Sequence, residues 1–326
     1  MPVTSVEKDL DQLTITIIAD FAAPLRRLWD AYTDPRQIER FWGPPTYPAR
    51  FLRHDALAGG RSLYSMTGPE GDVHFGCWDW TSAEAPHTFE VLDRFSDAAG
   101  RPIPDLPTTR VEFAFEETRD GSRLRTTSYF ESLEQMQQLI EMGMLEGTRE
   151  AMSQIDQVLA DLASFATERA TEAQILSDTQ VRVARVIRGT APQVWRAHTD
   201  AALMKRWLLG PDGWSMPVCE IATAVGDSYR YEWQRDGGEE RFGFTGELLE
   251  SQEPSRAVTT EAMIGMDFPA TLNELTLTEV EGGTLLCLVV TYANAEQRDA
   301  VLATGMTDGM ETSYARLESL LQPTLA

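Results

Sequence analysis

The segment WDAYTD at residues 29–34 recurs as WRAHTD at residues 195–200, 166 positions later in the chain. The correspondence continues, with small changes of offset, through GP at 43–44 and 210–211, FG at 75–76 and 242–243, and GM at 143–144 and 305–306. A period of about 165 residues is too long for a solenoid repeat and has the size of a globular domain. The 326 residues therefore predict two copies of one domain.

The composition is that of a folded protein outside the membrane. The hydrophobic fraction is 42%, with eight tryptophans, and no apolar run reaches the eighteen or so residues that cross a bilayer. Residues 1–9 lack the basic and apolar segments of a signal peptide. We therefore expect a cytoplasmic chain.

The net charge and the cysteine spacing limit the classes of partner and cofactor that we expect. Fifty-one acidic and 28 basic side chains give a formal charge of -23, which repels nucleic acid and anionic membranes. The three cysteines are far apart and form no metal-ligand spacing, so we expect buried thiols, with neither metal nor cofactor. The four histidines are also scattered, and His74 is expected to point away from the pocket strands.

Each half predicts the same order of elements. In the first half, a strand over 13–21 precedes two short helices that begin at Pro24 and Pro35. Six strand candidates follow, over 47–55, 61–67, 73–81, 88–95, 110–117 and 123–130. Apolar residues at three- and four-residue spacing from Met136 to Leu162 predict one long closing helix. The predicted domains are 1–163 and 180–326, joined by a linker over 164–179.

An antiparallel sheet of this kind buries one face, and one long helix is available to cover it. The predicted fold class is α+β, with two tandem helix-grip domains in which a curved sheet wraps around the closing helix. A space between sheet and helix becomes a ligand pocket when large side chains do not fill it.

The residues that carry this pattern resemble a known family. They are the Ala-Pro…Trp segment after the first strand, the Arg-aromatic…Gly-Pro segment at 40–44 and 206–211, and the Met-x-x-Gly start of the closing helix at 144–147 and 306–309. The chain resembles a tandem START-like (SRPBCC, Bet v 1-like) protein, in the subgroup similar to the C-terminal domain of the activator of Hsp90 ATPase. The resemblance implies lipid or metabolite binders, cyclase-like enzymes, stress-related proteins or an Hsp90 co-chaperone, and fold alone does not choose among them.

Strand alternation predicts which side chains face the closing helix. The candidates in the first half are Ser62, Tyr64, Met66, Phe75 and Cys77. Those in the second half are the bulkier Tyr229, Tyr231, Trp233, Phe242 and Phe244. From these two sets we expect the first cavity to be the roomier one. The alternative is that these rings are core residues only.

The helix side of the predicted pocket is formed by Ile140, Met144, Gly147, Leu302, Met306 and Gly309. Gly143, Gly147, Gly305 and Gly309 fall on the inward stripe of the closing helices, where glycine needs a local reason such as close approach of a ligand or of another element. Trp42 and Trp207 end the second short helix and could gate access to the cavity, or anchor the surface.

The leading functional hypothesis is binding of a hydrophobic small molecule, lipid-like or polyketide-like, between sheet and helix. The alternatives are a cyclase- or hydrolase-like enzyme and an Hsp90 co-chaperone-like interaction module. A buried polar residue with a shifted pKa in the pocket favours the enzyme, and an exposed apolar patch outside it favours the protein partner. The sequence identifies no catalytic residue, because no nucleophile elbow, phosphate loop or dinucleotide fingerprint is present.

Overall fold

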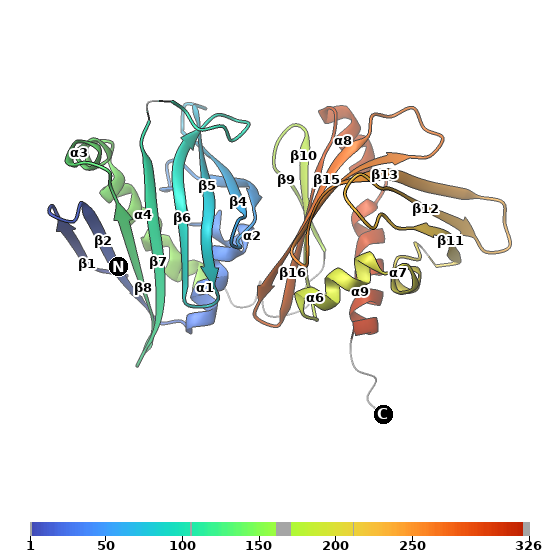
Figure 1. Ribbon diagram of the computed structural model, residues 1–326, viewed down its shortest axis with the longest axis horizontal. Helices are drawn as coiled ribbons and strands as arrows, with labels where there is room; N and C mark the ends of the chain where they lie inside the picture. Colours follow the sequence, from blue (N-terminus) through green and yellow to red (C-terminus); the bar gives the residue numbers. More distant parts are fainter. Residues whose placement is uncertain (1, 105, 161–170, 211, 322–326) are drawn as a thin grey trace. The chain divides into compact units, whose positions relative to one another are not determined.

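The computed structural model describes residues 2–104, 106–160, 171–210 and 212–321. The chain forms two compact units, 1–167 (domain 1) and 168–326 (domain 2), which are described separately (Figure 1). Each contains one eight-stranded antiparallel sheet and helices. The expected α+β class and the tandem repeat of one helix-grip domain are thereby confirmed.

The sheet of domain 1 has the strand order β1-β2-β8-β7-β6-β5-β4-β3. Its strands are β1 Val3–Asp9, β2 Thr14–Phe21, β3 Ala49–His54, β4 Arg61–Thr67, β5 Val73–Glu84, β6 Thr88–Ser96, β7 Thr108–Thr118 and β8 Gly121–Tyr129. The helices are α1 Leu25–Thr33, α2 Pro35–Ile38, α3 Leu133–Glu141 and α4 Met144–Ala160. The side chains of β2 alternate between buried and half-buried, and the buried set packs with Ile155 and Leu159 of α4 in one core.

Domain 2 repeats this order as β11-β12-β13-β14-β15-β16-β10-β9. Its strands are β9 Glu172–Ile175, β10 Gln180–Ile187, β11 Trp214–Glu220, β12 Ser228–Arg235, β13 Arg241–Gln252, β14 Arg256–Met263, β15 Thr271–Val280 and β16 Gly283–Thr291. The helices are α6 Ala191–Thr199, α7 Ala201–Trp207, α8 Ala295–Leu302 and α9 Met306–Leu321. A capping box between Thr190 and Gln193 fixes the start of α6.

A buried ion cluster holds α9 to the sheet of domain 2. Arg185 of β10 is 5% exposed, and its guanidinium contacts Glu311 and, at 3.0 Å, Glu318 Oε2 of α9. The register places Arg185 opposite Leu286, within the apolar core. In domain 1 the matched residue, 166 positions earlier, is the buried Ala19.

Two expectations about elements are wrong, and one strand was not anticipated. The single closing helix is broken in both domains, because Gly143 and Gly305 have φ of +87° and +79°, a left-handed backbone that ends a helix. The segment Glu172–Ile175, expected in the linker, forms β9 and pairs with β10. The first residues, to which no strand was assigned, form β1 and pair with β2. Leu162 and residues 164–170 of the expected linker lie outside the described residues.

Within the described ranges, no helix is both long and apolar enough to cross a membrane.

The break in the closing helix predicts opposite changes in the free energy of unfolding when Gly143 and Gly147 are each replaced by alanine. No atom lies within 4 Å of a side-chain carbon built on Gly143 or Gly147, so backbone conformation alone decides. Gly143→Ala should lower the free energy of unfolding by about 1 to 2 kcal/mol, because alanine resists a positive φ. The control Gly147→Ala lies in α4 and should raise it by about 0.5 to 1 kcal/mol. Urea denaturation measures both, and equal effects would contradict the assignment of Gly143 to a helix cap.

Candidate functional site

In domain 1, a tyrosine of β4 lies across the neighbouring strand. Tyr64 pairs with Gly76 of β5, and a side-chain carbon built on Gly76 would lie 2.3 Å from the Tyr64 ring. Only glycine leaves room for the ring here. Tyr64 Oη therefore reaches β6, where it donates a hydrogen bond of 3.3 Å to Asp93 Oδ1. We call the face of each sheet on which the helices pack the inner face, and Tyr64, Gly76 and Asp93 all lie on it.

The Asp93 carboxyl is desolvated, although the residue is not fully buried. Burial raises the pKa of its carboxyl to about 6, against the opposing effect of the nearby Tyr64 and Trp78 donors. The residue is nevertheless only half-buried. A carboxyl that is desolvated while part of its residue stays accessible is typical of a concave surface, where functional acids are often found.

Two indole rings face the same position. Trp42, which follows α2, and Trp78 of β5 meet edge to face with ring centroids 4.5 Å apart. The Trp42 N–H lies near the Tyr64 hydroxyl and the Trp78 N–H near the Asp93 carboxyl, where each opposes the rise in pKa that burial causes. Both Nε1 atoms are buried, yet neither makes a hydrogen bond of normal geometry to a described residue. Buried donors without a partner are uncommon in folded proteins and need an explanation, such as a ligand or a water.

Domain 2 contains the same arrangement, a tyrosine ring over a glycine of the next strand, at a neighbouring pair of positions. Tyr229 of β12 pairs with Gly246 of β13, and a side-chain carbon on Gly246 would lie 1.8 Å from the Thr260 carbonyl oxygen. Tyr229 Oη donates a 2.8 Å hydrogen bond to that oxygen and lies 3.4 Å from Glu261 Oε2. Burial raises the pKa of the Glu261 carboxyl, and the Asn273 and Tyr229 donors oppose the rise.

Asp93 and Glu261 occupy the same position in the two sheets. Cys77 pairs with Arg94 in domain 1, and Thr245 pairs with Ala262 in domain 2, so the two acids each precede a matched residue, 168 positions apart. The residues beside them differ in size. Ser62 pairs with Trp78 in domain 1, whereas at the matched positions of domain 2 Tyr229 pairs with Gly246. The large aromatic side chain therefore lies on β5 in domain 1 and on β12 in domain 2, whereas the acid lies at the same position in both sheets.

The same register corrects the expected facing of two residues. Tyr64 pairs with Gly76, and Tyr231 pairs with Phe244, so the offset between β5 and β13 is 168 and not 167. Because successive side chains of a strand point to opposite faces, a slip of one residue exchanges the faces. Phe75 and Cys77 therefore lie on the outer face, and Gly76 and Trp78 on the inner one.

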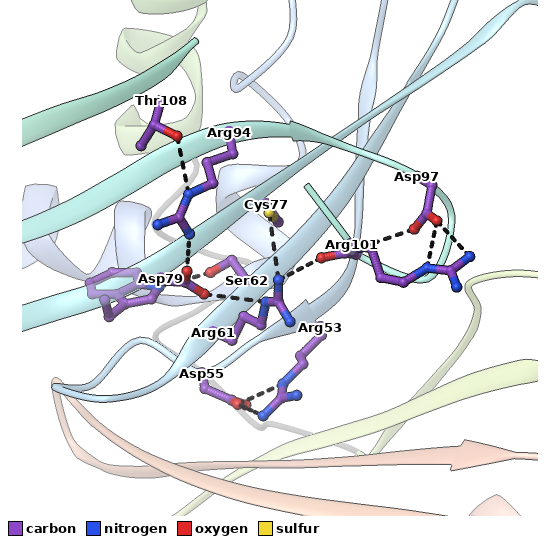
Figure 2. Close-up of polar contacts among 12 residues, drawn as sticks. Arg53, Asp55, Arg61, Ser62, Cys77, Asp79, Arg94, Asp97, Arg101 and Thr108 are labelled. Atoms are coloured by element: carbon purple, nitrogen blue, oxygen red, sulfur yellow. Dashed lines mark hydrogen bonds and ion pairs between the residues drawn. The ribbon is translucent and has the colours of Figure 1, made fainter. Parts of the chain in front are cut away.

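Figure 2 shows this outer face of domain 1. Arg61 Nη2 lies 3.7 Å from Cys77 Sγ, and Arg61 Nε lies 3.3 Å from Asp79 Oδ1. Arg94 contacts the other oxygen of Asp79 and donates from Nε to Thr108 Oγ1 at 3.2 Å. Cys77 is thus a buried thiol beneath an arginine–aspartate network, on the side away from Tyr64.

The other candidates of domain 1 have partners or packing that the structure defines. Ser62 is on the inner face, but its hydroxyl is already used by Trp80 Nε1 at 2.8 Å and His54 Nδ1 at 2.9 Å. Met66, Ile140 and Met144 are partly buried against the core, as is Trp42. His74 shares the inner face with Met66, contrary to expectation, but its side chain is 67% exposed and pairs with Asp72.

In domain 2 the expected facing holds. Tyr231, Trp233, Phe242 and Phe244 form one aromatic cluster, and the Trp233 and Phe242 rings stack with centroids 5.0 Å apart. Leu302 and Met306 pack at the edge of a separate aliphatic cluster. Trp207 does not gate a cavity, because it is 2% exposed, stacks on Tyr314 and donates to the Ala197 carbonyl.

The helix glycines do not serve close packing of another element. Gly143 and Gly305 end helices, and Gly309 is exposed. Gly147 is half-buried on the stripe between Met144 and Ala151, and a side-chain carbon there would meet nothing within 4 Å. A side chain at this position would therefore extend into open space.

The packing also disagrees with the expectation that the cavity of the first domain is the roomier one. The inner-face residues of domain 1 belong to one continuous core that includes Trp78, Trp80, Phe89 and Phe113, rings that a comparison of two strands overlooks. In domain 2 the aromatic cluster of β11–β13 is separate from the aliphatic cluster of β10, β16, α8 and α9. Between them β14 and β15 carry the polar Glu261 and Asn273.

Sequence reasoning missed both acids. Each lies in a strand whose neighbours are ordinary polar or apolar residues, and neither is marked by a motif. The signal that could have found them was the repeat itself, because the 168-residue offset aligns Asp93 with Glu261 in β6 and β14.

Comparisons with known proteins agree with the tandem arrangement. A family model described as "Activator of Hsp90 ATPase homolog 1-like protein" matches residues 22–160 and 188–322. The chain is similar to the crystal structure of protein Ms6760 from Mycobacterium smegmatis, with 44% identity over 51% of this chain and 99% of that one and a TM-score of 0.46. It is also similar to a solution structure of a protein from Arthrobacter aurescens, with 46% identity over 49% of this chain and 92% of that one and a TM-score of 0.47. No curated protein matches the chain.

Asp93 should leave a signature in the pH dependence of stability. Its folded pKa of about 6 exceeds the ordinary value of 3.8, so the folded state holds the proton more tightly and its stability falls as pH rises between these values. Asp93→Asn removes this loss. Relative to the unchanged protein, the variant should gain about 2 kcal/mol in unfolding free energy from pH 4 to pH 7, measured by urea denaturation. Tyr64→Phe should shift the loss to higher pH, and a pH-independent difference for Asp93→Asn would contradict the assignment.

Proposed function

The chain belongs to the Activator of Hsp90 ATPase homolog 1-like family, and we propose that each of its two domains binds an apolar small molecule on the inner face of its sheet. The observation that carries the proposal is the acid that recurs at one strand position in both domains, each time beside a tyrosine hydroxyl, Asp93 with Tyr64 and Glu261 with Tyr229. A buried acid is costly, and its presence in both copies favours a shared use.

The surroundings support a ligand that is mostly apolar and carries one polar group. In domain 1, Met66, Ile140 and Met144 are only partly buried beside the polar cluster, and Gly147 leaves space next to them. The indole N–H groups of Trp42 and Trp78 offer two donors without a partner among the described residues. A carbonyl or hydroxyl oxygen of a ligand satisfies such donors.

A second candidate function is catalysis in domain 1. Its support is the pKa of about 6 for Asp93, since a carboxyl that titrates near neutrality can exchange a proton with a bound substrate. This candidate requires turnover of a ligand in addition to binding.

The family name also refers to protein interaction, and a different set of residues supports that function. Met263, Met266, Phe268 and Leu272 are large apolar side chains, each at least 38% exposed, within ten residues of domain 2. A partner protein could cover them, but they do not involve the recurrent acid–tyrosine pairs.

Native mass spectrometry of the protein purified without detergent tests the binding proposal. We expect bound apolar molecules that organic extraction removes, and binding of added octanol by the extracted protein. Gly147→Leu should fill the open space in domain 1 and weaken octanol binding there at least tenfold. Glu146→Leu, at the exposed neighbouring position, is the matched control and should bind as the unchanged protein does.

A bare protein mass together with no binding of octanol up to its solubility limit would contradict the proposal. Equal octanol affinity in Gly147→Leu and Glu146→Leu would contradict the location in domain 1.

A further inference from the structure

We propose that the site in domain 2 is selective for an apolar amine, whose ammonium group pairs with the Glu261 carboxylate. The inference rests on the proposed function, because it specifies the chemistry of the ligand at one of the two sites. It comes from the donors, acceptors and charges around Glu261.

The neighbours of Glu261 orient its carboxyl without neutralising it. Thr271 Oγ1 donates a 2.9 Å hydrogen bond to Asn273 Oδ1, which leaves the Asn273 amide N–H groups to donate to Glu261. The Tyr229 hydroxyl lies 3.4 Å from Glu261 Oε2. The carboxyl is therefore held in place by neutral groups.

Within the described ranges, no positive charge is found to act on this carboxyl. Among the described residues, the groups that act on Glu261 are Asn273 and Tyr229, and the phenols of Tyr231 and Tyr292 lie close enough to be affected by its charge. All of them are neutral at physiological pH. Elsewhere in the same domain, buried Arg185 is paired with Glu311 and Glu318. A carboxylate removed from water without a counter-ion is unfavourable, and a cationic ligand supplies the missing charge.

Tyr292 is the second, independent sign of a ligand. The residue is 4% exposed, and its hydroxyl has no hydrogen-bond partner in the described part of the chain. Burial and the nearby Glu261 charge raise the pKa of Tyr292 to about 12. Tyr292 follows Thr291, which pairs with Leu272 of β15, and Thr271 of the same strand pairs with Glu261, so Tyr292 and Glu261 lie in one row across the sheet. An ammonium group can donate to Glu261 and to Tyr292 Oη together, because it carries three N–H donors.

Aromatic rings and apolar side chains complete a site for such a molecule. The rings of Tyr229 and Tyr231 lie with centroids 4.8 Å apart beside the carboxyl, and aromatic faces attract cations. Met263, on the inner face two residues after Glu261, is 38% exposed, and Leu302 and Met306 are partly buried. These side chains can contact the apolar part of the ligand.

Domain 1 does not share this selectivity. Asp93 has Arg94 as its neighbour, whose positive charge acts on the carboxyl, and two side-chain donors act on it, from Tyr64 and Trp78. The polar group of a ligand that fits these donors is an oxygen acceptor. The two copies thus differ in the charge of the polar group that they bind.

The test compares octylamine with octanol, which have the same apolar chain, by calorimetry on the full chain at pH 8 in 0.3 M sodium chloride. The salt screens the general attraction of an acidic protein for cations. We expect total octylamine affinity at least tenfold above octanol affinity. Glu261→Gln should reduce octylamine affinity at least tenfold, whereas the control Glu239→Gln, at an exposed position of the same domain, should leave it unchanged. Lowering the pH should weaken octylamine binding as Glu261 takes up a proton, without a matching change for octanol.

Tyr292→Phe gives a second arm if Glu261→Gln does not fold, and it should weaken octylamine binding while the thermal midpoint stays close to that of the unchanged protein. Equal binding of octanol and octylamine, or unchanged octylamine affinity in Glu261→Gln and Tyr292→Phe, would overturn the inference and leave the proposed function standing. Failure of both compounds to bind would overturn the two together.

Discussion

The inner face of each sheet depends on one contact, a tyrosine ring laid over a glycine of the next strand. Tyr64 over Gly76 and Tyr229 over Gly246 are possible only because glycine has no side chain there. A ring in this position spans a strand and brings its hydroxyl to the acid beyond it. The arrangement puts a hydrogen-bonded carboxyl in the middle of a surface that otherwise consists of apolar side chains.

The two copies share this device but surround it differently. In domain 1, Trp78 fills the space beside Asp93, and the apolar side chains of sheet and helices form one core. In domain 2, Gly246 takes the place of Trp78, and a polar band on β14 and β15 separates two apolar clusters. The acid is therefore common to both copies, whereas the residues around it differ.

The order of elements could be predicted from the sequence because it depends on local patterns. Alternation identified β4 with its observed bounds, and prolines marked the short helices. The closing helix was predicted as continuous because apolar spacing persists across Gly143, whereas the break depends on a single φ. The facing of Phe75 and Cys77 was wrong because pairing between strands is not local, and a repeat alignment displaced by one residue reverses every side chain. The acids were missed because their desolvation comes from residues distant in the sequence, such as Trp42 for the Asp93 site and Tyr292 for Glu261.

The buried charge in domain 2 adds a second kind of contact between the last helix and its sheet. A helix that covers a sheet is usually held by a continuous apolar stripe, and α4 meets this description through Ile155, Val158 and Leu159. In α9, Tyr314 and Leu317 pack with Leu277 and Leu286 of the sheet, and Glu311 and Glu318 in addition bind Arg185, where domain 1 has Ala19. Removal of one partner of such a buried pair typically costs about 3 to 5 kcal/mol, so the pairing fixes the helix to β10 specifically. Glu261 and Asn273 belong to neither set of contacts, so the polar residues of β14 and β15 are not the ones that hold the helix.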